Sequence, residues 1–156
     1  MMTEGFELVA FDREHILPVA ELEKACFSNP ISARNLEALL ISGIGKGFVC
    51  IETKSGNAVA YGGVMVAADE AQILNIATRS DFRRMGLGRA VVEAILDFSR
   101  SRGAEFITLE VREGNVSAIS LYEGLGFYEV GRIKKYYSDP TEDALILKKE
   151  LSSKSI

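Results

Sequence analysis

The chain reads Asn75-Ile-Ala-Thr-Arg-Ser-Asp-Phe-Arg-Arg-Met-Gly-Leu-Gly-Arg89 at the point where a strand-like run gives way to a helix-like run. The apolar run 73–77 comes first and ends in polar, turn-forming residues at 78–81. Behind the two glycines, apolar residues recur at helical spacing and form one stripe, made of Leu87, Ala90, Val91, Ala94, Ile95 and Phe98. The pattern therefore predicts a strand, a glycine turn and the N-terminus of a long helix.

The start of that helix has the properties of an anion site. The first turn of a helix carries unpaired backbone N–H groups and the positive end of the helix dipole. Gly86 and Gly88 have no side chain to keep a phosphate away, while Arg83, Arg84 and Arg89 add positive charge. A pyrophosphate is the most natural ligand. The alternative is an ordinary tight turn with solvated arginines, and neither of the two common nucleotide-binding glycine patterns is present.

The same residues resemble a known family. Arg83-Arg84-Met85-Gly86-Leu87-Gly88 is similar to the Arg/Gln-x-x-Gly-x-Gly/Ala acetyl-CoA motif of the GCN5-related N-acetyltransferase (GNAT) superfamily. The block from Leu109 to Phe127 and the segment 136–145 resemble its RimI-type branch, the ribosomal-protein alanine N-acetyltransferases. The resemblance extends over essentially the whole chain and is sharpest over residues 73–147.

Size and composition favour one globular domain. The chain has 156 residues, of which 47% are hydrophobic and 26% charged. We expect a single GNAT domain over residues 1–151 and a short frayed tail over 152–156. No apolar run approaches the ~20 residues that a membrane helix needs. The first five residues lack the basic and apolar regions of a secretory signal.

Charge and cysteine content narrow the function classes. A net charge of −4 argues against nucleic acid as a partner and is compatible with a cationic substrate such as an amine. With two cysteines and one histidine, we expect no metal site. Cys26 and Cys50 are expected to be buried thiols in a reducing compartment, so we expect a cytoplasmic protein without a membrane partner. We expect a monomer or a weak homodimer.

The remaining pattern predicts an α+β fold. Strand-like runs occupy residues 6–11, 48–51, 58–66, 71–78, 106–111, 127–132 and 144–148. Helices are expected after the caps Asp12, Ser32 and Asn115, in addition to the one behind Gly86. This order implies a mixed, mostly antiparallel sheet of six to seven strands with helices on both faces. Gly62 and Gly63 within a strand suggest a bulge or a close approach. The family resemblance implies that strands 71–78 and 106–111 splay apart around the cofactor.

Two residues are candidates for proton transfer. Acetyl transfer to an amine requires loss of an ammonium proton and protonation of the departing thiolate. Glu110 lies within an apolar run, and its alternatives are a pair with Arg112 or a place in solvent. Tyr122 lies at helical spacing and is otherwise an ordinary core tyrosine. The family resemblance implies that Glu110 is the general base and Tyr122 the general acid.

The resemblance also implies a set of cofactor contacts. The backbone of Ile76, Ala77 and Thr78 would pair with the pantetheine arm of acetyl-CoA like an added strand. Residues 83–89 would hold the pyrophosphate. Asn115 matches a residue that hydrogen-bonds the cofactor in the family, and on its own it is a plausible helix cap.

The acceptor side is less defined by the sequence. Tyr136, Tyr137, Glu142 and Asp143 form either a polar surface loop or, as the resemblance implies, an acceptor entrance whose acidic pair attracts a free amino terminus. Ile31 stands where the RimI-type branch typically has a tryptophan, a residue that this chain lacks altogether. This departure affects acceptor specificity and leaves acetyl transfer untouched.

Together these features predict an acetyl-CoA-dependent N-acetyltransferase. The implied acceptor is the N-terminal alanine of a small-subunit ribosomal protein. Two alternatives remain open. One is a small-molecule amine acetyltransferase on the same scaffold. The other is a non-catalytic acetyl-CoA-binding module, which would need the anion site but neither Glu110 nor Tyr122.

Overall fold

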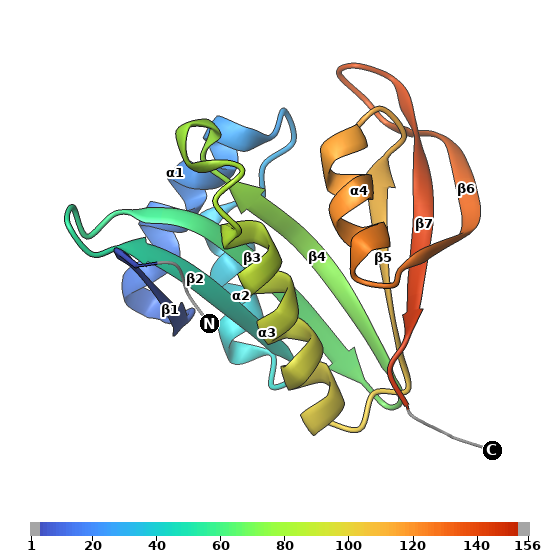
Figure 1. Cartoon of the computed structure of the whole chain (residues 1–156), viewed down its shortest axis with the longest axis horizontal. Helices are drawn as coiled ribbons and strands as arrows, with labels where there is room; N and C mark the ends of the chain where they lie inside the picture. Colours follow the sequence, from blue (N-terminus) through green and yellow to red (C-terminus); the bar gives the residue numbers. More distant parts are fainter. Residues whose placement is uncertain (1–3, 153–156) are drawn as a thin grey trace.

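A single seven-stranded sheet organises the computed structural model, which describes residues 4–152. The strands lie in the order β1-β2-β3-β4-β5-β7-β6 (Figure 1). Their bounds are β1 Phe6–Ala10, β2 Gly45–Glu52, β3 Ala58–Ala67, β4 Glu70–Thr78, β5 Phe106–Arg112, β6 Tyr128–Tyr137 and β7 Glu142–Glu150. Neighbours pair antiparallel except β4 and β5, which are parallel. The predicted mixed, mostly antiparallel sheet is confirmed.

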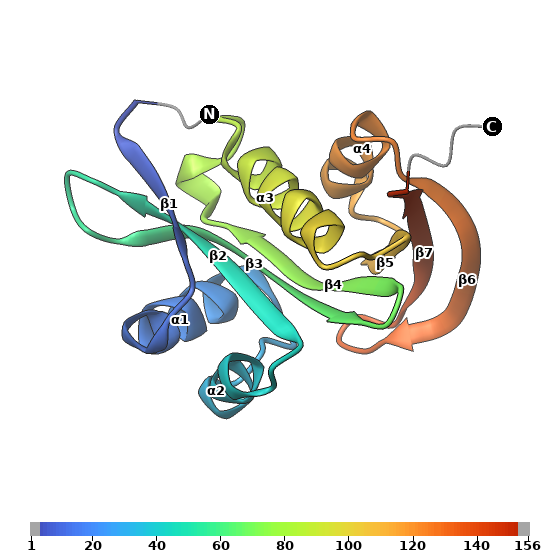
Figure 2. The same cartoon turned by 90° about the horizontal axis from the view of Figure 1, so that it is seen from below.

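Helices cover both faces of the sheet, as predicted. Figure 2 shows α1 and α2 on one face and α3 and α4 on the other. The helices are α1 Ile16–Cys26, α2 Ala33–Ile41, α3 Leu87–Ser101 and α4 Val116–Gly124, with short 3-10 turns η1 Arg13–His15 and η2 Ser80–Phe82. The predicted caps are in place, because the side chains of Asp12, Ser32 and Asn115 each accept a bond from a backbone N–H at the start of their helix.

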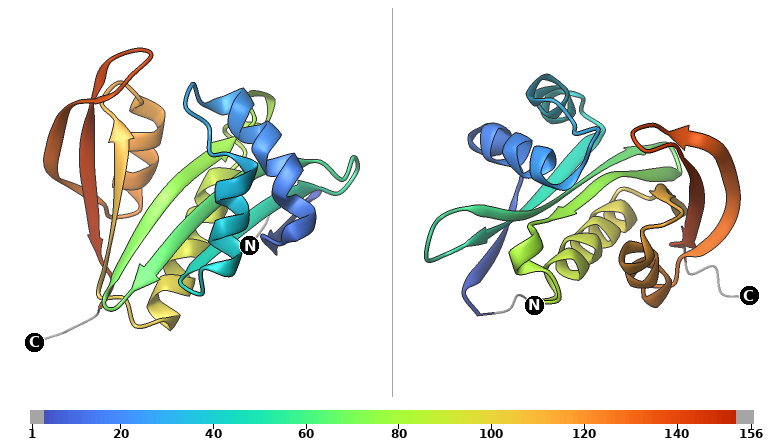
Figure 3. Two further views of the ribbon diagram at one scale, coloured as in Figure 1. Left: turned by 180° about the vertical axis from the view of Figure 1, so that it is seen from behind. Right: turned by 90° about the horizontal axis from the view of Figure 1, so that it is seen from above.

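Strands β4 and β5 separate after a short contact. Glu70–Gln72 of β4 pairs with Phe106–Thr108 of β5, and the pairing stops there. The two strands then diverge, so that the sheet opens as a wedge (Figure 1, and from behind in Figure 3). The splay that the family resemblance implied is therefore present.

A bulge in β4 accompanies this separation. Val64 of β3 faces Ile73 while Gly62 faces Ile76, so two residues of β4, Leu74 and Asn75, lie opposite one residue of β3. Such an extra residue bends its strand and increases its twist. A Cβ atom on Gly62 would collide with Val91 and lie 2.7 Å from Cδ1 of Ile76. The irregular pairing predicted at Gly62–Gly63 is thus found, with the extra residue on the partner strand, and the groups that approach Gly62 closely are side chains and not another backbone.

Helix α3 packs on the sheet through a face that differs in part from the predicted stripe. Leu87, Val91 and Ile95 are buried as expected, and Val92, Leu96 and Ser99 complete the buried face. Ala90 and Ala94 instead line a shallow surface cavity that α3 shares with Leu125 and Lys149. The two alanines are half-buried, because the buried face of α3 is turned toward Val92, Leu96 and Ser99 and leaves them at its edge.

Two further expectations can be compared with the described residues. Among residues 4–152, no helix is long and apolar enough to cross a membrane. Cys50 is buried as predicted, whereas Cys26 is only half-buried, because the end of α1 borders an open cleft. Apart from Ser152, the predicted tail 152–156 lies outside the described residues.

Candidate active site

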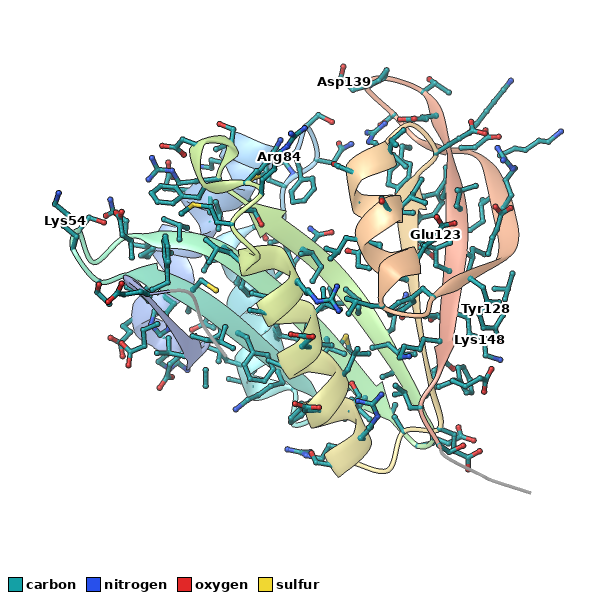
Figure 4. The ribbon with its side chains drawn as sticks, in the orientation of Figure 1. Lys54, Arg84, Glu123, Tyr128, Asp139 and Lys148 are labelled. Atoms are coloured by element: carbon teal, nitrogen blue, oxygen red, sulfur yellow. The ribbon has the colours of Figure 1, made fainter. Side chains whose placement is uncertain are left out.

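The wedge between β4 and β5 holds a continuous cleft. Three adjoining cavities of about 650, 470 and 380 Å³ share lining residues along its length. We call the two ends of the cleft the glycine end, beside Gly86, and the tyrosine end, beside Tyr136 and Tyr137. Figure 4 shows Arg84, at the glycine end, and Asp139, at the tip of the β6–β7 connection, on opposite sides of the opening.

The glycine end has the predicted form of an anion site. Gly86 takes a left-handed conformation, with φ of 81°, and directly precedes the first turn of α3. The first amides of α3 therefore remain available to a ligand, as at any helix N-terminus. The cavity here is lined by the predicted residues Ile76, Ala77, Thr78, Arg83, Arg84, Gly86, Leu87, Gly88, Arg89, Asn115 and Tyr122, together with Phe82 and Leu121.

Individual side chains at this end have different roles. Arg83 Nε donates to the carbonyl of Thr78 at 3.2 Å and so fixes the loop to the end of β4. Arg89 forms an exposed ion pair with Glu93 at 3.4 Å. Met85 is 40% exposed, and it is absent from the lining of this cavity among the described residues. The motif therefore supplies the site mainly through its glycines and arginines.

Strand β4 presents an open edge to the cleft. Its partnership with β5 ends at Gln72, so within residues 4–152 no strand pairs with Ile76, Ala77 and Thr78 on that side. All three residues line the glycine end. An unpaired strand edge can bind an extended ligand by strand addition, although the Thr78 carbonyl already accepts from Arg83 and Cys26.

Tyr122 lies where the glycine end meets the centre of the cleft. It lines both cavities, its side chain is 5% exposed, and its ring packs edge-on against Phe127 at 5.5 Å. Burial raises the pKa of its phenol, as does the nearby Tyr137. The hydroxyl therefore keeps its proton near neutral pH. Helix α4 places it there through the Asn115 cap, whose Oδ1 accepts from the Ala118 N–H at 3.3 Å.

One apolar residue of α4 is exposed. Val116 has an exposed fraction of 73%. It lies in the first turn of the helix, directly after the cap, where the chain leaves the sheet.

Glu110 lies between the centre of the cleft and the tyrosine end. It is half-buried on β5, opposite Ile146 of β7, and it lines both cavities. The interaction with its carboxylate raises the pKa of Tyr136, so the Tyr136 hydroxyl lies near it. Burial and the Glu110 charge raise the pKa of Tyr137 to about 12. Glu110 thus faces the cleft beside two tyrosine hydroxyls.

Arg112 does not pair with Glu110, which removes one alternative for that residue. Its guanidinium instead binds Glu142 at 3.1 Å and the carbonyls of Pro140 and Ser138 at 2.9 and 3.0 Å. It also lies over the Tyr137 ring at 4.5 Å. Across the cleft, Asn29 Nδ2 donates to the same Ser138 carbonyl at 3.2 Å. These bonds connect the α1–α2 loop to the β6–β7 turn.

The tyrosine end collects three of the five residues considered for the acceptor side. Ile31, Tyr136 and Tyr137 line it together with Glu110 and Asn75. Tyr136 and Tyr137 lie on β6, while Glu142 and Asp143 begin β7, so these residues belong to strands and not to a surface loop. This arrangement favours the entrance over the surface-loop alternative.

The acidic pair expected there is already engaged. Glu142 binds Arg112, and it also accepts from the backbone N–H of Gly114. Asp143 binds Arg132 at 3.1 Å and the N–H of Lys135 at 2.9 Å. Glu142 does line the centre of the cleft, but its charge is balanced by Arg112. Both carboxylates are thus paired with arginines, and attraction of an amino terminus by this acidic pair stays a prediction.

Several cleft residues gave no signal in the sequence. Asn29, Asn75 and Cys26 all line the cleft, and the Cys26 thiol donates to the Thr78 carbonyl at 3.4 Å. Burial raises the pKa of this thiol. Glu23, on α1, is fully buried behind the tyrosine end. These residues meet through the fold, so no local spacing could identify them.

Comparisons with known proteins agree with this geometry. The family model described as "Acetyltransferase (GNAT) family" matches residues 16–127. The [ribosomal protein bS18]-alanine N-acetyltransferase of Escherichia coli K12 is 43% identical over 97 residues, which cover 61% of this chain and 66%, just under two thirds, of that protein. A putative enzyme of the same name from Bacillus subtilis is 33% identical over 86% of this chain and 88% of its own length.

A solved structure extends the similarity over nearly the whole chain. The crystal structure of the ribosomal-protein-S18-alanine N-acetyltransferase from Escherichia coli superposes with a TM-score of 0.86 and 30% sequence identity, covering 96% of both chains. The fold around the cleft is therefore shared from β1 to β7.

Proposed function

Because the chain belongs to the Acetyltransferase (GNAT) family, we propose that it transfers an acetyl group from acetyl-CoA to the free amino terminus of a protein. The acceptor that we propose is the N-terminal alanine of a small-subunit ribosomal protein, in the cytoplasm. One observation carries this proposal: a single cleft passes from an anion site, past Tyr122, to Glu110 and a separate pocket.

The glycine end fits coenzyme A. The α3 amides, Arg84 and Arg89 would hold the pyrophosphate, and the open edge of β4 would pair with the pantetheine arm. A Cβ on Gly88 would lie 3.4 Å from Thr78 Oγ1, in ordinary van der Waals contact, so Gly88 lies close to the end of β4. When bound, the cofactor supplies a thioester-activated acetyl group. The side chains described here supply the proton transfers.

Glu110 is suited to accept the proton of the incoming ammonium. Its carboxylate faces the junction between the centre of the cleft and the tyrosine end, where an acceptor amine would arrive. It can act directly or through one water molecule. The Tyr136 hydroxyl lies near this carboxylate, as the raised pKa of Tyr136 indicates. Arg112, the nearest cation on the same strand, is held by Glu142 and does not compete for the carboxylate.

Tyr122 is suited to protonate the departing thiolate. Its hydroxyl is neutral near pH 7 because burial raises its pKa, and it lies on the side of the cleft toward the glycine end. A buried phenol with nearby apolar contacts is a fixed proton donor. The two proton transfers are thus assigned to residues on opposite sides of the reacting centre.

The acceptor assignment is supported by the relatives' names and by the shape of the tyrosine end. The cavity there is about 380 Å³, which suits the first residues of a peptide, and Ile31 and Tyr136 form its rim. A small-molecule amine remains the second candidate, because Ile31 replaces the tryptophan that is typical of the branch.

Thiol release from acetyl-CoA tests the proposal. Peptides beginning Ala-Arg are compared with polyamines and amino sugars, and the same peptides with a blocked amino terminus serve as the matched control. We expect turnover with the free peptides alone. Turnover only with small amines would move the function to the second candidate. Cofactor binding without turnover in either set would favour a binding module.

A further inference from the structure

Glu23 is a buried carboxylate that the proposed chemistry does not use. It lies on α1 with an exposed fraction of 0%, among the buried residues Val19, Ala20 and Leu22 of the same helix. A carboxylate in such surroundings is unfavourable unless its oxygens are hydrogen-bonded. An apolar residue would suit this helix face better, so the bonds of Glu23 deserve an explanation.

One oxygen of Glu23 joins two walls of the tyrosine end. Oε1 accepts from the backbone N–H of Ile31 at 3.0 Å and from Asn75 Nδ2, also at 3.0 Å. Ile31 lies in the α1–α2 loop, and Asn75 lies in the bulge of β4. Both residues line the same cavity. The carboxylate therefore fixes the loop against the strand at the place where the pocket is shaped.

In the part of the chain that the structure describes, the second carboxylate oxygen of Glu23 is buried without a partner, which a purely structural residue would avoid. Within residues 4–152, Oε2 is buried and has no hydrogen-bond partner, and burial raises the pKa of the carboxyl. A neutral carboxylic acid keeps Oε1 as an acceptor and reduces the penalty of burial. A glutamine has the same shape and the same acceptor, so it is the natural conservative replacement.

We propose that Glu23 is a positioning residue for the acceptor, holding Ile31 and Asn75 at the spacing that the incoming amino terminus requires. This inference rests on the proposed function for the identity of the acceptor. The geometry that it invokes, a fixed distance between loop and strand, does not depend on which amine is used. Glu23 acts through its two partners and does not touch the reacting atoms.

Three variants test the proposal through steady-state kinetics. Glu23→Leu removes the acceptor oxygen, Glu23→Gln retains it, and Glu21→Gln changes an exposed carboxylate two residues away on the same helix. We expect Glu23→Leu to raise the acceptor KM about tenfold, since two hydrogen bonds are lost, and to leave the acetyl-CoA KM within about twofold. Glu23→Gln and Glu21→Gln should both behave like the wild type. An equal rise of both KM values in Glu23→Leu would overturn the proposal.

Amide exchange provides a readout that needs no turnover. The Ile31 N–H should exchange about tenfold faster in Glu23→Leu than in Glu23→Gln, with the amides of β2 and β3 unchanged. Unchanged protection at Ile31 would refute the positioning role. If the wild type acetylates no peptide or amine, the proposed function fails while this measurement still decides the role of Glu23.

A further variant, at Asn75, tests the proposal if Glu23→Leu does not fold. Asn75→Ala removes one of the two donors, and should raise the acceptor KM by a smaller factor in the same direction. A rise in the acetyl-CoA KM alone would contradict the proposal, because it would place Asn75 in the cofactor path instead.

Discussion

The two ends of the cleft are built in different ways. The glycine end comes largely from one continuous stretch, from Ile76 to Arg89, and it offers mainly backbone groups to a ligand. The tyrosine end is assembled from the α1–α2 loop, the β4 bulge, β5 and β6, and side-chain hydrogen bonds connect these segments. The glycine end depends on one local motif, so its cofactor chemistry is fixed together with that motif. The tyrosine end depends on side chains from several segments, so its specificity can change through single substitutions.

Replacing Glu110, the proposed base, should have the largest effect on kcat of the variants considered, because Glu110 lies where the two ends of the cleft meet. Glu110→Gln removes the proton acceptor and should lower kcat by a factor of about 10² to 10⁴. Coenzyme A affinity, measured by calorimetry, should not change, because Glu110 lies outside the lining of the glycine end. Turnover equal to that of the wild type would exclude Glu110 as the base.

One substitution at the glycine end should change the acetyl-CoA KM without changing the acceptor KM. Gly86→Ala forces an alanine into a left-handed conformation directly before α3, at an expected strain of about 1 kcal/mol. Because the strain is released by moving the turn, we expect the acetyl-CoA KM to rise about tenfold and the acceptor KM to stay constant.

A glycine at the other end of the same helix provides the control for this variant. Gly103 has φ of 82°, and a Cβ there meets nothing within 4 Å, as at Gly86. Gly103→Ala should therefore lower the thermal midpoint by a similar amount without changing either KM. If both variants changed the acetyl-CoA KM equally, the effect would be one of general stability.

The tyrosine end should respond to loss of one hydroxyl by a smaller factor. Tyr136→Phe removes the hydroxyl that lies near Glu110 and should lower kcat/KM for the acceptor about two- to tenfold. Tyr128→Phe is the matched control, because it removes a hydroxyl of the same strand that is bonded to Glu150 at 2.8 Å, away from the cleft. Equal losses in both variants would remove any specific role of Tyr136.

We expect no effect of Tyr122 ionisation on activity or stability between pH 6 and 9. Burial raises the pKa of this phenol above its ordinary value of about 10, so both the folded and the unfolded chain keep the proton over this range. The stability that the neutral phenol contributes is present below pH 10 and is lost as the pH rises through the folded pKa. A fall in kcat between pH 8 and 9 with bound acceptor would contradict this assignment.

The sequence was sufficient for features that a few neighbouring residues determine. Gly86 takes the conformation that only glycine adopts readily, and the caps Ser32 and Asn115 mark the helix starts within a residue. The glycine end followed from the same local pattern. The splay of β4 and β5, by contrast, came from the family resemblance, and the structure relates it to a bulge that two glycines signalled only in part.

The remaining features depend on residues that lie far apart in the chain. Arg112 meets Ser138 and Glu142, and Glu23 meets Asn75, across 26 to 52 positions. Nothing in the spacing of Glu142 and Asp143 showed that both carboxylates are balanced by arginines. Likewise, Cys26 is an apolar residue on a helix, and only the position of the cleft explains why it is half-buried.

The short contact between β4 and β5 also means that a small rotation at the contact moves the far end of β4 by a larger distance. The strands touch over Glu70–Gln72, and β4 continues for six residues to Thr78, a span of about 20 Å at the usual rise per residue. A rotation of about 5° at the contact therefore displaces the far end of β4 by about 1.7 Å. A small change of angle at the β4–β5 contact thus changes the width of the cleft most beside Thr78, at the glycine end, where product is expected to leave.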